Sequence, residues 1–178
     1  MNKVFCLFFL LLFCFCTNRE DERHIIKKYY GKRLNMEWIN EQLLHDTVTK
    51  VNTVSFEGKK IIVHLDEKQC QQCIVNTLSM VGEYSKTLQS KNISATIICI
   101  VPLKMQDILN INEQIEGLSD IIIVSDVDNK FLKLNKLEKY TNKFHSFLLD
   151  NSNKVLLIGD PIHYENVRSL YNKRLVSK

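Results

Sequence analysis

Two cysteines separated by two residues come directly after a short apolar stretch, and this feature constrains the fold more than any other. Ile61-Ile-Val-His-Leu65 has the composition of a buried strand, and Cys70-Gln-Gln-Cys73 follows it after a turn. Apolar residues then recur at helical spacing, which predicts a helix over residues 71–90. A strand therefore delivers the cysteine pair to the N-terminus of a helix.

This placement suits thiol chemistry. The N-terminus of a helix carries a partial positive charge and unpaired N–H groups, which stabilise a thiolate. The thiolate is the nucleophile in thiol–disulfide exchange. Lys68, two residues before Cys70, is a possible neighbour that adds to the positive field. Because a two-residue gap lets the sulfur atoms reach each other, we expect Cys70 and Cys73 to form a redox or disulfide pair.

A metal site is the alternative interpretation of the cysteine pair. Structural zinc sites usually contain a second Cys or His pair at recognisable spacing, and none is present among the remaining cysteines, Cys6, Cys14, Cys16 and Cys99. A site made of Cys70, Cys73 and His64 stays open, since thiolates and imidazole suit zinc or copper. We expect no metal and no other cofactor.

The first 16 residues differ from the rest of the chain. Lys3 gives a basic start, and Val4–Cys16 holds only apolar residues and cysteines. These thirteen residues are too few to span a bilayer, which needs roughly 20 residues, and their order suits a secretory signal peptide. A cysteine that closes such a segment resembles a bacterial lipoprotein signal. We expect lipidation at Cys16, with Cys14 or an uncleaved hydrophobic anchor as alternatives.

Each of these three interpretations of the N-terminal segment places the protein in the cell envelope, tethered to a membrane and facing the periplasm or the cell surface. A thiol pair outside the cytoplasm is normally oxidised unless something keeps it reduced. Cys99 lies in the apolar run Ile97–Val101 and is expected to be a buried small hydrophobe. The net charge is +4 without a long basic run, so we expect no nucleic-acid partner.

The rest of the pattern alternates between strands and helices. Strands are predicted at residues 47–56, 61–65, 93–101, 120–125, 144–149 and 154–159, and helices at 21–30, 36–45, 71–90, 104–116, 129–137 and 162–175. Asp150–Asn153 predicts a hairpin turn, and Asp160 is placed to cap the last helix. We expect an α/β fold: a central mixed sheet, helices on both faces, and a C-terminal β-hairpin plus helix.

Residues 58–175 resemble the thioredoxin-like lipoproteins of Gram-negative envelopes, which are related to the TlpA/ResA-type thiol–disulfide oxidoreductases. The strand before Cys70-Gln-Gln-Cys73 carries part of the likeness. Phe144-His-Ser-Phe-Leu-Leu-Asp150 and Asn153-Lys-Val-Leu-Leu-Ile-Gly159 carry the rest. This divides the chain into a lipoprotein-type signal peptide (1–16), an N-terminal extension (17–57) and a thioredoxin-like domain (58–178).

The resemblance implies roles for single residues. His64 occupies the position at which many thioredoxins hold a buried acid, so we predict that it relays a proton to Cys73; the alternative is a core histidine bonded to backbone. Phe144 stands at the position of the superfamily's cis-proline, which faces the cysteines, so it is a possible neighbour of the site. We expect a trans bond there, because a cis bond would cost roughly 3 kcal/mol. His145 is a possible neighbour of the cysteines; the alternative is a strand residue facing solvent.

Two classes of function remain open. The first is a membrane-anchored thiol–disulfide oxidoreductase of the cell envelope, in which Cys70 attacks a disulfide and Cys73 resolves the mixed disulfide. Its partners would be protein thiols and disulfides, and the membrane through the N-terminal lipid. The second is a non-catalytic binding or structural lipoprotein with a static Cys70–Cys73 bridge. Glu67 stands where peroxiredoxins place a threonine, which argues against a peroxidase.

Overall fold

A five-stranded mixed sheet forms the centre of the protein. The computed structural model describes residues 17–39, 58–112, 115 and 118–177. The strands are ordered β3-β2-β1-β4-β5 across the sheet. Their bounds are Lys60–His64 (β1), Thr96–Val101 (β2), Ile121–Ser125 (β3), Ser146–Leu149 (β4) and Val155–Ile158 (β5). The first three strands are parallel, and β4 and β5 are antiparallel to their neighbours.

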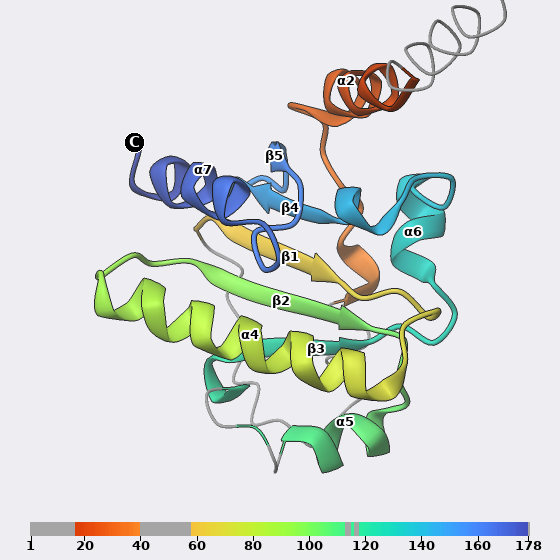
Figure 1. Cartoon of the computed structure of the whole chain (residues 1–178), viewed down its shortest axis with the longest axis vertical. Coiled ribbons are helices and arrows are strands. Elements are labelled where there is room, and N and C mark those ends of the chain that lie inside the picture. Colours follow the sequence, from red (N-terminus) through yellow and green to blue (C-terminus); the bar gives the residue numbers. More distant parts are fainter. Residues whose placement is uncertain (1–16, 40–57, 113–114, 116–117, 178) are drawn as a thin grey trace, which may run out of the picture.

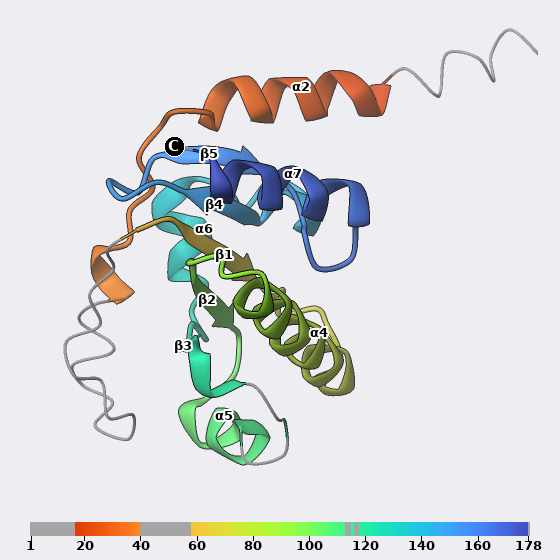
Figure 2. The same cartoon turned by 90° about the vertical axis from the view of Figure 1, so that its left-hand side faces the viewer.

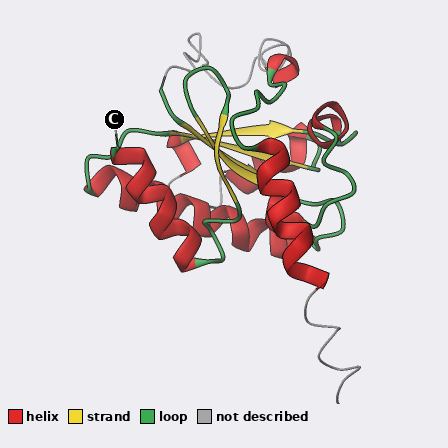
Figure 3. Cartoon of the chain, turned by 90° about the horizontal axis from the view of Figure 1, so that it is seen from above, coloured by secondary structure: helices red, strands yellow, loops and turns green. Residues whose placement is uncertain are grey.

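Helices cover both faces of this sheet (Figure 3). Their bounds are Thr17–Tyr29 (α2), Gln71–Ser90 (α4), Met105–Asn112 (α5), Lys130–Asn135 (α6) and Glu165–Val176 (α7). Figures 1 and 2 show α4 and α7 on one side of the strands and α6 on the other, with α2 lying over β5. The predicted α/β class, with a mixed sheet and a C-terminal hairpin plus helix, is confirmed.

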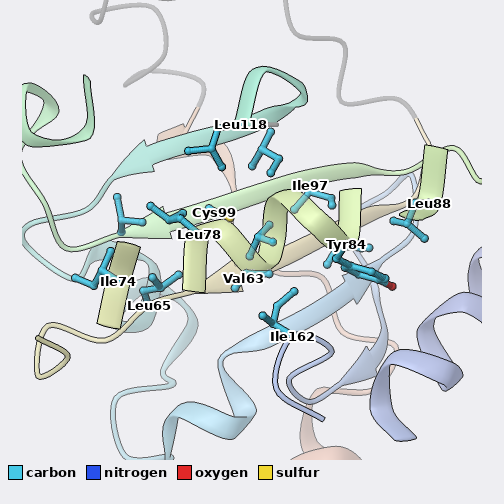
Figure 4. Close-up of a cluster of buried hydrophobic side chains, with 14 of the residues drawn as sticks. Val63, Leu65, Ile74, Leu78, Tyr84, Leu88, Ile97, Cys99, Leu118 and Ile162 are labelled. Carbon is cyan, nitrogen blue, oxygen red and sulfur yellow. The ribbon is translucent and has the colours of Figure 1, made fainter. Parts of the chain in front are cut away.

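Successive side chains of the strands point to opposite faces of the sheet, so the core consists of two clusters, one on each face. Ile61, Val63 and Leu65 point into the cluster that contains the buried face of α4, and Figure 4 shows part of this cluster. Ile62 points to the opposite side, into a cluster with Phe131 of α6. Because side chains of a strand alternate between faces, a strand buried on both sides reads as the continuous apolar run seen in the sequence.

The N-terminal segment belongs to the second cluster. Ile25 and Tyr29 of α2 are buried there, as are Leu34, Met36, Trp38 and Ile39. Gly31 ends α2 with a φ of +73°, a left-handed conformation that favours glycine. The chain then runs beside the sheet edge, where the N–H of Gly31 donates to the carbonyl of Val155 and the N–H of Val155 donates to Lys32.

Most predicted elements are confirmed with shifted ends, but the prediction for the start of the last helix was wrong. Asp160 does not cap α7; its side chain accepts the N–H groups of Ile162 and His163 in a turn before the helix. The guanidinium of Arg168 donates to the carbonyls of Pro161 and Ile162, which therefore do not enter the helical ladder. The helix starts after Tyr164 instead. The predictions for residues 40–45 and 47–56 lie outside the described residues.

Candidate redox site

The cysteine pair closes a disulfide at the first turn of α4. The Cα atoms of Cys70 and Cys73 are 5.1 Å apart. Cys70 is the N-cap of the helix, with extended backbone angles (φ −66°, ψ 151°). Its Sγ atom accepts a hydrogen bond from the backbone N–H of Cys73 at 3.2 Å, where other helices use a Ser or Asp oxygen. A Cys70 thiolate would thus face the positive end of the helix.

Both cysteines are exposed to solvent, and so are Gln71 and Gln72 between them. Exposure of Cys70 allows a substrate disulfide to approach it for in-line attack. Exposure of Cys73 also bears on proton transfer, because water can take the proton of an exposed thiol. An internal relay is therefore not required here as it would be for a buried second cysteine.

The loop before Cys70 is held by side-chain contacts. The Asp66 carboxylate accepts the backbone N–H of Lys68 at 2.8 Å. The carboxylate of Glu67 accepts the side-chain N–H of Asn129, at the start of α6, at 2.7 Å. Lys68 itself is exposed and precedes Cys70 by two residues in the chain, and its effect on the Cys70 thiol stays a prediction.

His64 lies on the α6 side of the sheet. Its neighbours Val63 and Leu65 face α4, whereas its ring stacks on Phe131 with centroids 5.6 Å apart. Only 6% of His64 is exposed, and its Nδ1 has no hydrogen-bond partner. Burial, reinforced by the nearby His145, lowers the pKa of His64 to about 3. The imidazole is therefore neutral across the physiological range, which removes the reason for expecting it to titrate near neutral pH.

His145 is buried beside His64. The two rings are nearly perpendicular, at 84°, with centroids 5.5 Å apart. His145 is 2% exposed, and neither ring nitrogen has a hydrogen-bond partner. Burial lowers the pKa of His145, although nearby carbonyls of Leu137 and Tyr140 act in the opposite direction. The alternative of a strand residue facing solvent is wrong for this position.

A polar cleft of about 910 Å³ adjoins the loop that leads to Cys70. Three segments form it, and its lining residues are Asp66, Glu67, Lys68, Asn129, Leu132, Lys133, Glu138, Lys139, Tyr140, Thr141, Lys143 and His145. Lys68 and His145 therefore lie at one cleft, whereas Cys70 and Cys73 are not among its lining residues. Tyr140 and Asn129 also line it, and no local sequence pattern indicated them, because the cleft joins three segments that are apart in the chain.

Phe144 takes part in a different surface. It is half-buried and lines a smaller cleft of about 500 Å³ with His24 and Tyr140. The ammonium of Lys143 lies 4.9 Å from the centre of its ring. All peptide bonds of the described residues are trans, including the bond before Phe144, which confirms that expectation.

The described residues contain no group of three His, Cys, Asp or Glu side chains arranged to hold a metal ion. Cys99 is fully buried in β2, and burial raises the pKa of its thiol to about 12, which confirms its place in the core. None of the helices within the described ranges has the length and apolar character needed to cross a membrane.

No family model matches the sequence, and no curated protein matches it. Among solved structures, the chain is similar to a SCO1/SenC family lipoprotein from Bacillus anthracis str. Ames. The two share 16% identity over 69% of this chain and 84% of that one, with a TM-score of 0.51. A bacterioferritin comigratory protein from Xanthomonas campestris shares 12% identity, over 70% and 82% of the chains, with a TM-score of 0.49.

A third similar structure is a putative thiol:disulfide interchange protein DsbE from Chlorobium tepidum. It shares 16% identity over 68% of this chain and 79% of that chain, with a TM-score of 0.44. At these identities the likeness concerns the fold and not the activity. The parallel β1-β2-β3 block, the antiparallel β4 and β5, and the C-terminal hairpin plus helix are the architecture expected from the sequence for a thioredoxin-like domain. The chain has a thioredoxin-like fold.

Proposed function

We propose that this thioredoxin-fold chain is a membrane-anchored thiol–disulfide oxidoreductase of the cell envelope, with Cys70 and Cys73 as its redox pair. The observation that carries the proposal is the exposed Cys70–Cys73 disulfide at the N-terminus of α4. A disulfide with only a structural role gains nothing from exposure of both sulfur-bearing residues. A catalytic pair needs that access, because the reaction proceeds by thiolate attack on a disulfide sulfur.

In the reducing direction, the Cys70 thiolate attacks one sulfur of a substrate disulfide. The Cys70–substrate bond forms, the substrate S–S bond breaks, and the other substrate sulfur leaves as a thiolate. The Cys73 thiolate then attacks Cys70 and releases the second substrate sulfur. The substrate gains two electrons and two protons, and the Cys70–Cys73 disulfide is restored. In the oxidising direction every step runs in reverse.

The substrates in this proposal are protein thiols and disulfides outside the cytoplasm, and the anchor is a lipid on Cys16. The apolar segment before Thr17 supports the anchor, and so does the similarity to a structure named as a lipoprotein. His64 has no part in the proposed proton transfer, because its imidazole is neutral and lies on the side of the sheet away from α4.

A redox titration tests the proposal. A fragment starting at Thr17 contains every described element; with Cys99→Ala it has no thiols besides the pair. Alkylation after equilibration in dithiol buffers gives the midpoint potential. A midpoint between roughly −120 and −270 mV is expected, the range of known exchange catalysts. A midpoint below about −300 mV, typical of structural disulfides, would favour the static-disulfide lipoprotein.

Trapping the intermediate provides a second test. Cys73→Ser removes the resolving thiol, so the variant should accumulate a mixed disulfide between Cys70 and a substrate such as insulin. Cys70→Ser should form little adduct under the same conditions. Equal trapping by the two variants would contradict the assignment of Cys70 as the attacking residue.

A further inference from the structure

A basic stretch begins within α2, directly after the acidic run Glu20-Asp-Glu22, and continues beyond the end of the helix. Residues 23–36 contain five Lys or Arg and no Asp or Glu, while the whole chain has a net charge of only +4. Without this segment the remaining chain is slightly acidic. The five cations are Arg23, Lys27, Lys28, Lys32 and Arg33. All except Lys28 are exposed.

The outer face of α2 also exposes apolar side chains. Ile26 is 46% exposed and Tyr30, directly after the helix, is 59% exposed. They are four residues apart and therefore lie on one side of the helix, next to Arg23 and Lys27. Aromatic and aliphatic side chains mixed with Lys and Arg are the composition of helices that lie in a membrane interface.

The inner face of α2 is fixed to the folded domain. Ile25 is fully buried, and Tyr29 is 5% exposed with its hydroxyl at 3.0 Å and 2.8 Å from the carbonyls of Asn135 and Lys136. Figure 2 shows α2 lying across the top of the sheet, over β5. The helix is thus a fixed part of the domain and not a flexible spacer. A membrane contact made by its outer face would therefore also fix how the whole domain is oriented on the membrane.

The next residues extend the charged surface along the sheet edge. Arg33 forms an isolated antiparallel bridge with Lys154 at the start of β5. Paired residues across such a bridge project to the same side, which brings these two exposed cations together. The side chain of Arg33 is held there by its bond to the carbonyl of Ser152 at 2.8 Å.

We propose that the outer face of α2, formed by Arg23, Ile26, Lys27 and Tyr30, together with Lys32 and Arg33, docks on the anionic lipid headgroups of the membrane that holds the protein. The inference rests on the membrane attachment proposed above, but not on the redox activity. Thr17 directly follows Cys16, so a lipid on Cys16 places the first turn of α2 at the bilayer surface.

A basic surface beside a lipid anchor strengthens the attachment to a membrane. Acyl chains and a basic patch are separate signals whose contributions to membrane binding combine. Each Lys or Arg near an anionic surface adds attraction to that surface, and this attraction decays with distance over about one Debye length. A flat α2 keeps Lys27 and Lys32 within that distance, whereas an upright helix of 13 residues would hold its far end about 20 Å away.

A lysine-reactivity footprint on the full-length protein tests this surface. The protein is reconstituted into vesicles of phosphatidylcholine, alone or mixed with phosphatidylglycerol, and labelled with an amine-reactive reagent. Labelling of Lys27 and Lys32 should fall by about fivefold in the anionic vesicles. Lys91, exposed at the far end of α4, is the internal reference and should not change. High salt should restore labelling.

Paired variants separate a specific surface from a general charge effect. Ile26→Glu with Lys27→Glu should return the labelling of Lys32 in anionic vesicles to its level in phosphatidylcholine. Leu170→Glu with Lys173→Glu is the matched control, because it changes an exposed apolar residue and an exposed lysine of α7. The control should keep the protection of Lys32.

The outcomes distinguish the two proposals. If the protein floats with the vesicles but Lys27 and Lys32 label equally in both lipid mixtures, the docking surface is wrong and the anchor stands. If the protein does not float with vesicles of either kind, the anchor is wrong and the docking surface falls with it. Loss of protection in both paired variants would also overturn the assignment to α2.

Discussion

The rings of His64 and His145 meet edge to face inside the protein, with centroids 5.5 Å apart, although 80 residues separate them in the chain. Both are almost fully buried, and three of their four ring nitrogens lack a hydrogen-bond partner. Two neutral imidazoles are therefore held where a charged imidazolium is strongly disfavoured. This relationship makes the stability of the protein depend on pH.

Acid should destabilise the fold through His64. Its pKa is about 3 in the folded state and about 6.5 in an unfolded chain, so unfolding takes up a proton between these values. Stability is therefore highest above pH 6.5 and falls as the pH decreases. Relative to His64→Phe, the wild-type free energy of unfolding should fall by about 2 kcal/mol between pH 7.5 and pH 5. Denaturant unfolding at each pH measures this difference.

The Phe variant is suited to this comparison because it keeps a ring against Phe131 and has no titratable group. The carboxylates contribute equally to both proteins, so their effect cancels in the difference. Two curves of unfolding free energy that stay parallel from pH 7.5 to pH 5 would show that His64 is not held neutral.

His64→Gln should leave thiol–disulfide exchange almost unchanged. General acid–base catalysis typically contributes 10²–10⁴-fold to a rate, and a group with a pKa of about 3 cannot supply it at neutral pH. We expect the rate of insulin reduction to change by less than about twofold, with the same pH profile. A large loss, or a shifted profile, would restore the relay first predicted from the sequence.

Lys60 should be important for stability although it carries a charge. It is 1% exposed, and its ammonium donates to the carbonyls of Gly58, Asp150 and Asn151 at 3.1–3.3 Å. Lys60→Met keeps the length of the side chain but removes the donor, so the free energy of unfolding should decrease by about 2 kcal/mol. Lys91→Met, at an exposed position, is the control and should change it by less than about 0.5 kcal/mol.

Tyr29→Phe should loosen α2 without unfolding the domain. The variant removes the hydroxyl that donates to the end of α6, at Asn135 and Lys136, and keeps the buried ring. We expect a loss of about 1 kcal/mol, together with faster amide exchange in the last turns of α2. Hydrogen exchange by mass spectrometry measures the amide exchange rates of α2 and of β1. Equal acceleration in α2 and β1 would indicate global destabilisation instead.

The local pattern of the sequence was sufficient for the fold class and for the disulfide pair. A strand followed by Cys70, Cys73 and a long apolar-periodic helix requires no distant information, because side-chain period and helix-capping position are local properties. The helix predicted at 71–90 matches α4 at both ends. The start of α7 was missed because Arg168, a residue within the helix, binds the carbonyls of Pro161 and Ile162.

By itself, then, the sequence determined that this chain forms a mixed α/β sheet with a cysteine pair at a helix N-terminus. Only the tertiary structure decided that His64 turns away from α4 toward Phe131 and His145, that Asn129 and Tyr140 line a cleft beside the cysteine loop, and that α2 is fixed to the sheet edge. These relationships join residues far apart in the chain. They depend on strand order and register, which long-range packing sets and local periodicity leaves open.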